Sequence, residues 1–180
     1  MGKVVKNIHA VALGIWKTYS IKITSRQSSI GNRLRLFKGA TLSAYPHGRI
    51  IIGNDVRIDS YSTLVCVDQA CITIGDKVGI GSRNIIVSRN SISIGSNTIM
   101  GPNVMIYDHD HKFDGDHGVY RTEYNTDTIS IGSNCWIGAG TIILKGTHIG
   151  NNCLIGAGCI IKGSIPDNSK IIQKRDTLYL

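Results

Sequence analysis

The chain has 180 residues, of which 42% are hydrophobic and 18% charged, so it suits a single folded domain and excludes a disordered protein. Its formal net charge of +8 favours an anionic partner, such as nucleic acid, an acidic membrane surface or a phosphorylated small molecule. Its five cysteines lack paired CxxC spacing, which is typical of a reduced cytoplasmic protein and argues against a disulfide scaffold.

Residues 1–29 carry no repeat and contain the segment IHAVALGIWKTYSIKI. The apolar run AVALGIW is too short to span a bilayer, and without a small-residue cleavage site we expect no signal peptide. We expect a helical or irregular cap over one end of the repeat that follows. The alternative is peripheral contact with a membrane surface, helped by Lys3, Lys6, Lys17 and Lys22.

An apolar residue recurs at every sixth position in six triplets. The triplets are Ile30, Leu36 and Leu42; Ile52, Ile58 and Leu64; Ile74, Ile80 and Ile86; Ile94, Met100 and Ile106; Ile131, Ile137 and Ile143; and Ile149, Ile155 and Ile161. A period of six fits neither a helix nor a plain alternating strand. It predicts a triangular solenoid, in which each unit forms a short strand and a turn and the apolar residues stack inward. We therefore expect an all-β parallel β-helix of about six coils over residues 30–166, with a tail at 167–180.

The position four residues after each apolar residue is also expected to face inward, in a narrower space. It holds Val56, Val78, Thr98, Val104, Cys135, Thr141, Cys153 and Cys159. These cysteines are interpreted as small core residues and not as nucleophiles, because free cysteine behaves as a small buried hydrophobe. Cys66 and Cys71, at a coil junction, receive the same interpretation.

The repeat is interrupted once, by residues 107–130, which begin YDHDHKFDGDH. Three of the six histidines of the chain lie in this segment. Loops that leave a rigid scaffold are where binding and catalysis concentrate, so we expect the functional site here. The other histidines (His9, His47 and His148) are expected to be structural or exposed.

The stretch IGSNCWIGAGTIILKGTHIGNNCLIGAGCIIKGSIP resembles the hexapeptide-repeat acyltransferases. A long loop with a DH pair before TISIGSNCWIGAG is similar to the galactoside, maltose and streptogramin acetyltransferase branch, which includes O-acetyltransferases of surface polysaccharides. The resemblance implies a left-handed β-helix, a homotrimer with active sites between subunits, and acetyl-CoA as donor without a metal. It also implies direct acetyl transfer, in a ternary complex, to a hydroxyl of a saccharide or similar small acceptor.

The family also implies roles for residues of the loop. His109, which follows Asp108, stands where the general base of the family stands, and His111 is the alternative because it precedes a DG pair as in the streptogramin enzymes. A neutral imidazole takes the proton of the attacking hydroxyl. Asp108 or Asp110 would orient that imidazole, and Asp110 is also a candidate for contact with the acceptor.

Coenzyme A is expected along the last coils, against the backbone at Ala139 and Ala157, with Lys162 near a phosphate. Trp136 would line the pocket for the acyl end of the donor, or would pack between subunits. Asn84 is the nearest match to an asparagine that assists the acceptor in the family. Lys174 and Arg175 are further candidates for phosphate contact, although the chain departs here from the Ala-Gly-x-Pro segment of the family.

Two other classes of protein remain open. A carbonic-anhydrase-like metal enzyme would bind Zn²⁺ through His109, His111 and His117. A purely structural solenoid would have uninterrupted coils, which the loop contradicts. Nucleic-acid binding is not expected, because no aromatic residues alternate with the basic ones. Whether the acceptor is a sugar, a sugar nucleotide or an antibiotic, and whether it offers a hydroxyl or an amine, stays open.

Overall fold

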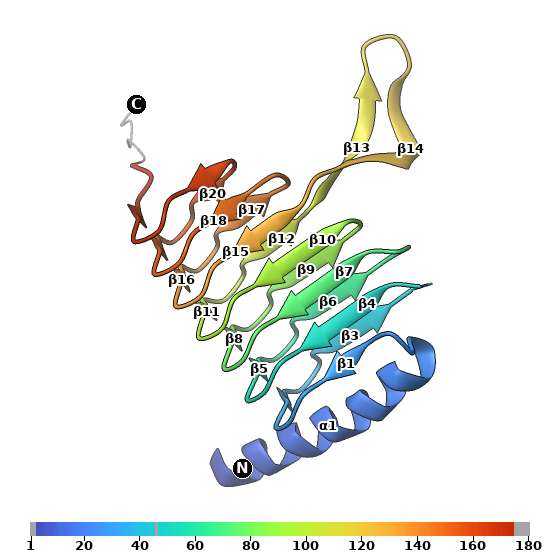
Figure 1. Ribbon diagram of the computed structural model, residues 1–180, viewed down its shortest axis with the longest axis vertical. Coiled ribbons are helices and arrows are strands. Elements are labelled where there is room, and N and C mark those ends of the chain that lie inside the picture. Colours follow the sequence, from blue (N-terminus) through green and yellow to red (C-terminus); the bar gives the residue numbers. More distant parts are fainter. Residues whose placement is uncertain (1–2, 46, 175–180) are drawn as a thin grey trace, which may run out of the picture.

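The computed structural model describes residues 3–45 and 47–174, most of which form one parallel β-solenoid. Short strands recur on three sides, and each pairs in parallel with the equivalent strand of the next coil. Figure 1 shows the coils stacked in single file, with a helix at one end and a hairpin leaving the side. The all-β solenoid of about six triangular coils predicted from the repeat is confirmed.

The three sides of the prism are parallel sheets, here called sheets A, B and C. Sheet A contains β1 (Ser29–Ile30), β4 (Arg49–Ile52), β7 (Cys71–Ile74), β10 (Ser91–Ile94), β15 (Ile129–Ile131), β18 (His148–Ile149) and β21 (Ser164–Ile165). Sheet B contains β2 (Arg35–Leu36), β5 (Arg57–Ile58), β8 (Gly79–Ile80), β11 (Ile99–Met100), β16 (Trp136–Ile137), β19 (Leu154–Ile155) and β22 (Lys170–Ile171). Sheet C contains β3 (Thr41–Ala44), β6 (Thr63–Cys66), β9 (Ile85–Ser88), β12 (Met105–Tyr107), β17 (Ile142–Leu144) and β20 (Ile160–Ile161).

The core is the inside of the prism, and the sixth-position residues fill it. Seventeen of the eighteen are at most 5% exposed, and Ile30 is partly buried at the end of the stack. Equivalent residues lie in register from coil to coil, as in the series Ile74, Ile94 and Ile131. Because each buried aliphatic side chain contributes about 1.5–3 kcal/mol, this stacking is the main force that selects the solenoid.

The residues four places after each apolar position are buried as predicted, including Cys135, Cys153 and Cys159. Cys66 is also buried, and all five cysteines are free thiols. Cys71 differs from its prediction as a core residue, because it lies on the outward side of β7 and is partly exposed. In β7 the buried positions are Ile72 and Ile74, so the strand alternation turns Cys71 away from the core.

The corner between sheets A and B is built from asparagine and aspartate. Asn97, Asn134 and Asn152 adopt left-handed backbone angles with φ of 57–59°, a conformation that asparagine tolerates better than most residues. Side chains at this corner accept hydrogen bonds from the backbone of the preceding coil, as in Asn54 N to Asp76 Oδ1 at 2.6 Å. These bonds fix the register between coils at each turn.

Helix α1 (Lys3–Thr24) lies across the first coil, next to β1, β2 and β3 (Figure 1). Ala10 and Ile21 are buried in this contact. Gly14 is required at the crossing, because a Cβ at this position would lie 2.1 Å from the carbonyl oxygen of Leu34. The segment expected to be a helical or irregular cap is thus a helix packed on one end of the solenoid. Within the described residues, no helix is long and apolar enough to cross a bilayer.

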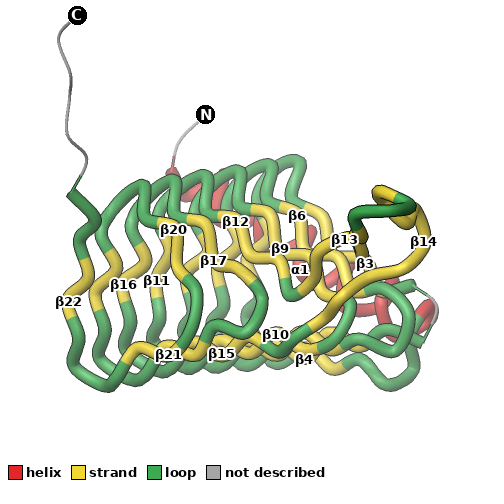
Figure 2. Tube along the Cα trace, turned by 90° about the horizontal axis from the view of Figure 1, so that it is seen from above, coloured by secondary structure: helices red, strands yellow, loops and turns green. Residues whose placement is uncertain are grey.

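The segment that interrupts the repeat is an antiparallel hairpin formed by β13 (His109–Asp114) and β14 (Gly118–Thr126). It leaves the prism after β12 and rejoins it at β15, and Figure 2 shows it outside the stack of coils. Sheet B extends into the expected tail, since β22 ends at Ile171. Arg175 lies outside the described residues.

Candidate functional site at the base of the hairpin

Asp108 anchors the hairpin to the solenoid. Its side chain is fully buried at the corner between sheets C and A, one coil beyond Ser88. Its Oδ2 atom accepts hydrogen bonds from Ser88 Oγ at 2.7 Å and from Asn90 N at 2.9 Å. Its Oδ1 atom accepts one from Arg89 N at 2.8 Å. Three donors therefore hold a buried carboxylate in one orientation.

His109 is held by that carboxylate. Its Nδ1 atom lies 3.1 Å from Asp108 Oδ1, and its side chain is 13% exposed. Tyr107 and Tyr124 contact the ring by their edges, with ring centroids 6.0 and 5.5 Å from that of the imidazole. Within the described residues no protein group is hydrogen-bonded to Nε2. A hydrogen bond at Nδ1 selects the tautomer whose Nε2 carries a free lone pair, so Nε2 is the atom able to accept a proton.

Three residues that the sequence analysis did not identify also lie where the hairpin meets the prism: Arg89, Tyr124 and Lys145. The Arg89 guanidinium lies 3.7 Å from the ring centroid of Tyr124 and is also 3.0 Å from Asp68 Oδ2. Lys145 is 3.0 Å from Asp110 Oδ2 and donates to the carbonyl of Asn125, so it ties both hairpin strands to the next coil. These contacts fix where the hairpin stands relative to the prism.

The other two histidines of the hairpin lie farther from the prism and have different partners. His111 is exposed, with its Nδ1 atom 3.2 Å from the carbonyl oxygen of Tyr120. His117 pairs with Asp114 near the tip of the hairpin, at 3.1 Å. Tyr120 also donates a hydrogen bond to Asp114, which lowers the pKa of that carboxyl group and raises the pKa of the phenol. Of the three histidines, His109 alone contacts a buried carboxylate.

The two residues expected near the acceptor, Asn84 and Asp110, have different surroundings. Asn84 is fully buried within the prism, where its Oδ1 atom accepts a hydrogen bond from Val104 N at 2.7 Å. Its side-chain nitrogen Nδ2 has no hydrogen-bond partner among the described residues. This side chain supports the coil and does not reach the surface. Asp110 is exposed, follows His109 in β13 and is paired with Lys145.

Three of the four residues expected to bind coenzyme A lie along another edge of the prism. Trp136 is 54% exposed on sheet B, and Ala139 and Ala157 occupy the next corner, one coil apart. The coils approach closely there, because a Cβ on Gly138 would lie 2.4 Å from Ala157 N. The width of sheet C, about 16 Å for five extended residues, separates this edge from His109 within one chain. Lys162 is exposed on the edge nearer the hairpin.

The outer surface of sheet C, between these two edges, is apolar from β9 to β20. Its outward residues stack in register from coil to coil and are partly or fully exposed: Ile85, Val87, Met105, Tyr107, Ile142, Leu144 and Ile160. Single exposed hydrophobic residues are common, whereas contiguous apolar surfaces are typical of association sites. His109 stands beside Tyr107 at one border of this surface.

No group of three or more histidine, cysteine, aspartate or glutamate side chains within the described residues is arranged to hold a metal ion. The three hairpin histidines each have a separate hydrogen-bond partner instead. The chemistry that this arrangement offers is proton transfer by an oriented imidazole.

Comparison with known proteins agrees with the fold and the repeat. Residues 128–163 match a family described as bacterial transferase hexapeptide (six repeats). The crystal structure of AntD, an N-acyltransferase from Bacillus cereus in complex with dTDP and 3-hydroxybutyryl-CoA, superimposes with a TM-score of 0.69 and 25% identity. That superposition covers 84% of this chain and 80% of the other. The chain is therefore similar to the hexapeptide-repeat transferases in its last coils and in its fold.

Two curated proteins are similar in sequence. A probable acetyltransferase of Mycobacterium tuberculosis is 29% identical over 161 residues, which are 86% of this chain and 52% of that protein. The galactoside O-acetyltransferase of Lactococcus lactis is 39% identical over 83 residues, 46% of this chain and 40% of that protein. The chain thus spans about half the length of the curated relatives that it matches.

Proposed function

We propose that this protein is an acetyltransferase that moves the acetyl group of acetyl-CoA to a hydroxyl of a saccharide or similar small acceptor, with His109 as general base. The observation that carries the proposal is the pair formed by Nδ1 of His109 and the buried carboxylate of Asp108. The pair stands at the one long interruption of the repeat, which supports a functional role for it.

The proposed transfer is direct, within a complex that contains both donor and acceptor. Nε2 of His109 takes the proton of the acceptor hydroxyl while the oxygen forms a bond to the thioester carbonyl carbon. The carbon–sulfur bond then breaks, and the imidazolium returns the proton to the departing thiolate of coenzyme A. A positioned base of this kind accelerates transfer by about 10²–10⁴-fold. Asp108 holds the imidazole in the required tautomer and stabilises its charged form.

The proposed active site lies between subunits of a homotrimer. In one chain, the width of sheet C separates His109 from the edge at Ala139 and Ala157. Association through the apolar surface of sheet C would bring that edge of one subunit beside His109 of another. The exposed side chains on this surface support the arrangement, because burying them is favourable and they border the histidine.

The donor would lie along the edge at Ala139 and Ala157, where only small side chains cover the backbone. Trp136 would contact the acyl end, and Lys162, on the edge nearer the hairpin, would reach a phosphate from the neighbouring subunit. AntD, which is 25% identical to this chain over the matched region, contains 3-hydroxybutyryl-CoA in its crystal structure and supports a coenzyme A thioester as donor. Metal is not required in this scheme, since the base and the donor suffice.

The proposed class of acceptor is inferred from the acceptors of similar proteins. The galactoside O-acetyltransferase of Lactococcus lactis supports a sugar hydroxyl. Other AntD crystals contain dTDP-4-amino-4,6-dideoxyglucose, so an amino sugar nucleotide is the acceptor class to test beside hydroxyl sugars. The same base serves both, because either nucleophile must lose a proton to the enzyme during transfer.

The test is thiol release from acetyl-CoA in the presence of a panel of hydroxyl saccharides, sugar nucleotides and amino sugar nucleotides. We expect acceptor-dependent release with at least one class, and loss of that release in His109→Gln. Mass spectrometry of the product then distinguishes an ester from an amide. Acceptor-dependent release that His109→Gln leaves intact would overturn the assigned base, and absence of any donor turnover would overturn the proposed activity.

A further inference from the structure

The positive charge of this protein is concentrated at the end that carries α1. Residues 1–54 contain nine of the twenty lysines and arginines and none of the twelve acidic residues, because Asp55 is the first carboxylate of the chain. Residues 55–180 therefore hold eleven basic and twelve acidic side chains, a balance of −1 against +9 for the first part. Among the described residues before Asp55, Arg33 is the one found in an ion pair, with Asp55 itself.

Helix α1 has two apolar faces. The inner face contains Ala10, Gly14 and Ile21 and packs on the first coil. The outer face, on the opposite side of the helix at 3.6 residues per turn, contains Val5, Ile8, Ala12, Ile15 and Tyr19. Ile8, Ile15 and Tyr19 are 65%, 55% and 66% exposed, and Trp16 beside them is 65% exposed. The packing of α1 on the solenoid requires the inner face and leaves the outer face without a function.

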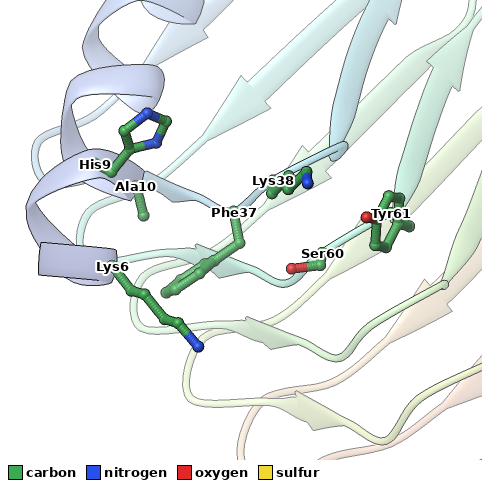
Figure 3. Close-up of a pocket in the computed structure, with 7 residues that line it drawn as sticks. All are labelled: Lys6, His9, Ala10, Phe37, Lys38, Ser60 and Tyr61. Atoms are coloured by element: carbon green, nitrogen blue, oxygen red, sulfur yellow. The ribbon is translucent and has the colours of Figure 1, made fainter. Parts of the chain in front are cut away.

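Basic side chains lie along the same helix. Lys6 is exposed, and Lys17 has its ammonium 6.0 Å from the ring centroid of Trp16. A cleft of about 540 Å³ runs between the helix and the first two coils, and Figure 3 shows Lys6 and Lys38 around it, with Ala10 and Phe37 between them. No acidic residue lines this cleft. This end of the protein therefore has exposed aliphatic and aromatic side chains on the outer face of α1, and cations on the side of the helix nearer the coils.

We propose that the outer face of α1 binds the surface of a membrane that contains anionic lipids. Aliphatic side chains in this position enter the boundary between headgroups and acyl chains, and tryptophan and tyrosine favour the same depth. The nine basic residues of 1–54, with no acidic residue among them, attract this end of the protein to the lipid phosphates. The inference stands apart from the proposed acetyl transfer, because it uses no residue of the hairpin.

A second copy of this chain fits the same face less well. Pairing two such ends would bring the excess positive charge of residues 1–54 against an equal charge without a carboxylate to offset it. An anionic lipid surface instead supplies the opposite charge together with an apolar layer. The charge distribution therefore selects a lipid surface as the occupant.

Binding in this way would set the orientation of the whole protein. Because α1 lies across the end of the solenoid, the coils would stand away from the membrane (Figure 1). The hairpin leaves after β12, which is three strand spacings, or about 14 Å, beyond β3 of the first coil. A site at its base would then face acceptors held close to a membrane.

The experiment is sedimentation of the full-length protein with vesicles of pure phosphatidylcholine, or with about 30% phosphatidylglycerol added. We expect binding to the anionic vesicles that is at least tenfold stronger than to the neutral ones, and that weakens as NaCl is raised from about 0.1 to 0.5 M. The double substitution Ile8→Gln/Ile15→Gln should reduce binding at least tenfold. The matched control is Ile99→Gln/Ile172→Gln, which makes the same change at two exposed isoleucines away from α1 and should bind as the wild type.

Trp16 provides a second measurement. In a Trp136→Phe background, Trp16 is the only tryptophan of the chain, and its fluorescence should shift to shorter wavelength with anionic vesicles. Equal loss of binding in both double variants would overturn the assignment of the face. So would the absence of vesicle binding, or self-association of the wild type that Ile8→Gln/Ile15→Gln abolishes, since a second copy would then be the occupant.

Discussion

Asp108 and His109 are adjacent in sequence, and Asp108 Oδ1 lies 3.1 Å from Nδ1 of His109 although one side chain is fully buried and the other is partly exposed. The chain passes at this point from the wall of the prism into the hairpin. The carboxylate belongs to the rigid coil and the imidazole to the emerging strand. The coil therefore positions the histidine directly, without depending on the outer part of the hairpin.

Substitution of His109 should abolish most of the activity. In His109→Gln we expect kcat to fall by about 10²–10⁴-fold because no group remains to take the acceptor proton. His111→Gln, the matched change two residues along the same strand, should alter kcat by less than about threefold because its partner is a backbone carbonyl. Steady-state kinetics with acetyl-CoA and the acceptor from the panel measure both. The reverse order of the two effects would assign the base to His111.

Substitution of Asp108 should affect both stability and catalysis. In Asp108→Asn an NH₂ group replaces one carboxylate oxygen and faces N–H donors, so we expect a loss of about 1–3 kcal/mol in the free energy of unfolding. The kcat value should fall at least about tenfold, since the imidazole loses its orienting partner. The control is Asp110→Asn, at an exposed aspartate paired with Lys145, which should cost about 0–1 kcal/mol. Urea denaturation and kinetics separate the two roles, and a variant with wild-type values for both would remove Asp108 from the site.

The proposed position of the site between subunits allows a complementation test. His109→Gln removes the base, and Ala157→Glu places a bulky negative charge at the expected donor edge, so each variant alone should be inactive. If a site takes His109 from one subunit and the Ala157 edge from its neighbour, mixed trimers in equal proportion should regain about a quarter of the wild-type activity.

Two measurements control this experiment. Analytical ultracentrifugation of the wild type should give about three times the 19.5 kDa of one chain. The variants are mixed after denaturation and refolding, and unmixed samples taken through the same steps should stay inactive. Recovery of no activity in verified mixed trimers would place both residues in one chain's site and contradict the proposed arrangement.

The sequence predicted the solenoid because one physical requirement, an apolar residue at every sixth position, acts on every coil. Ile80 and Ile155 could be assigned to the core without knowledge of any neighbour. The position of the hairpin was predictable for the same reason, since a regular pattern makes its interruption visible. Cys71 was misassigned because it sits at a junction, where the count from the preceding apolar residue no longer sets the direction of the side chain.

The contacts that position His109 were not predictable in the same way. Arg89 and Tyr124 are 35 residues apart, and no periodic pattern links a coil corner to a hairpin strand. A local signal for Asp108 did exist. It continues the buried column of Ala44, Cys66 and Ser88, two residues after the apolar position of each coil, so a carboxylate there had to find hydrogen-bond donors.

The buried thiol of Cys66 gives a prediction on pH dependence. Burial raises the pKa of this thiol from 9.0 to about 11. Its Sγ atom donates a hydrogen bond to the carbonyl of Arg49 at 3.3 Å. In the unfolded chain the thiol ionises with its ordinary pKa of 9.0. Its contribution to stability is therefore fully present below about pH 9 and is lost as pH rises from there towards about 11.

The expected size is about 2–3 kcal/mol, because one unit of pKa corresponds to about 1.4 kcal/mol. Between pH 8 and pH 10.5, the wild type should lose more unfolding free energy than Cys66→Ala, in which nothing ionises at this position. Cys71→Ala, at the partly exposed thiol of the next strand, should follow the wild-type curve. Urea denaturation of the three proteins at both pH values measures the difference. If Cys66→Ala and the wild type lose stability in parallel, the thiol is not held protonated by the fold.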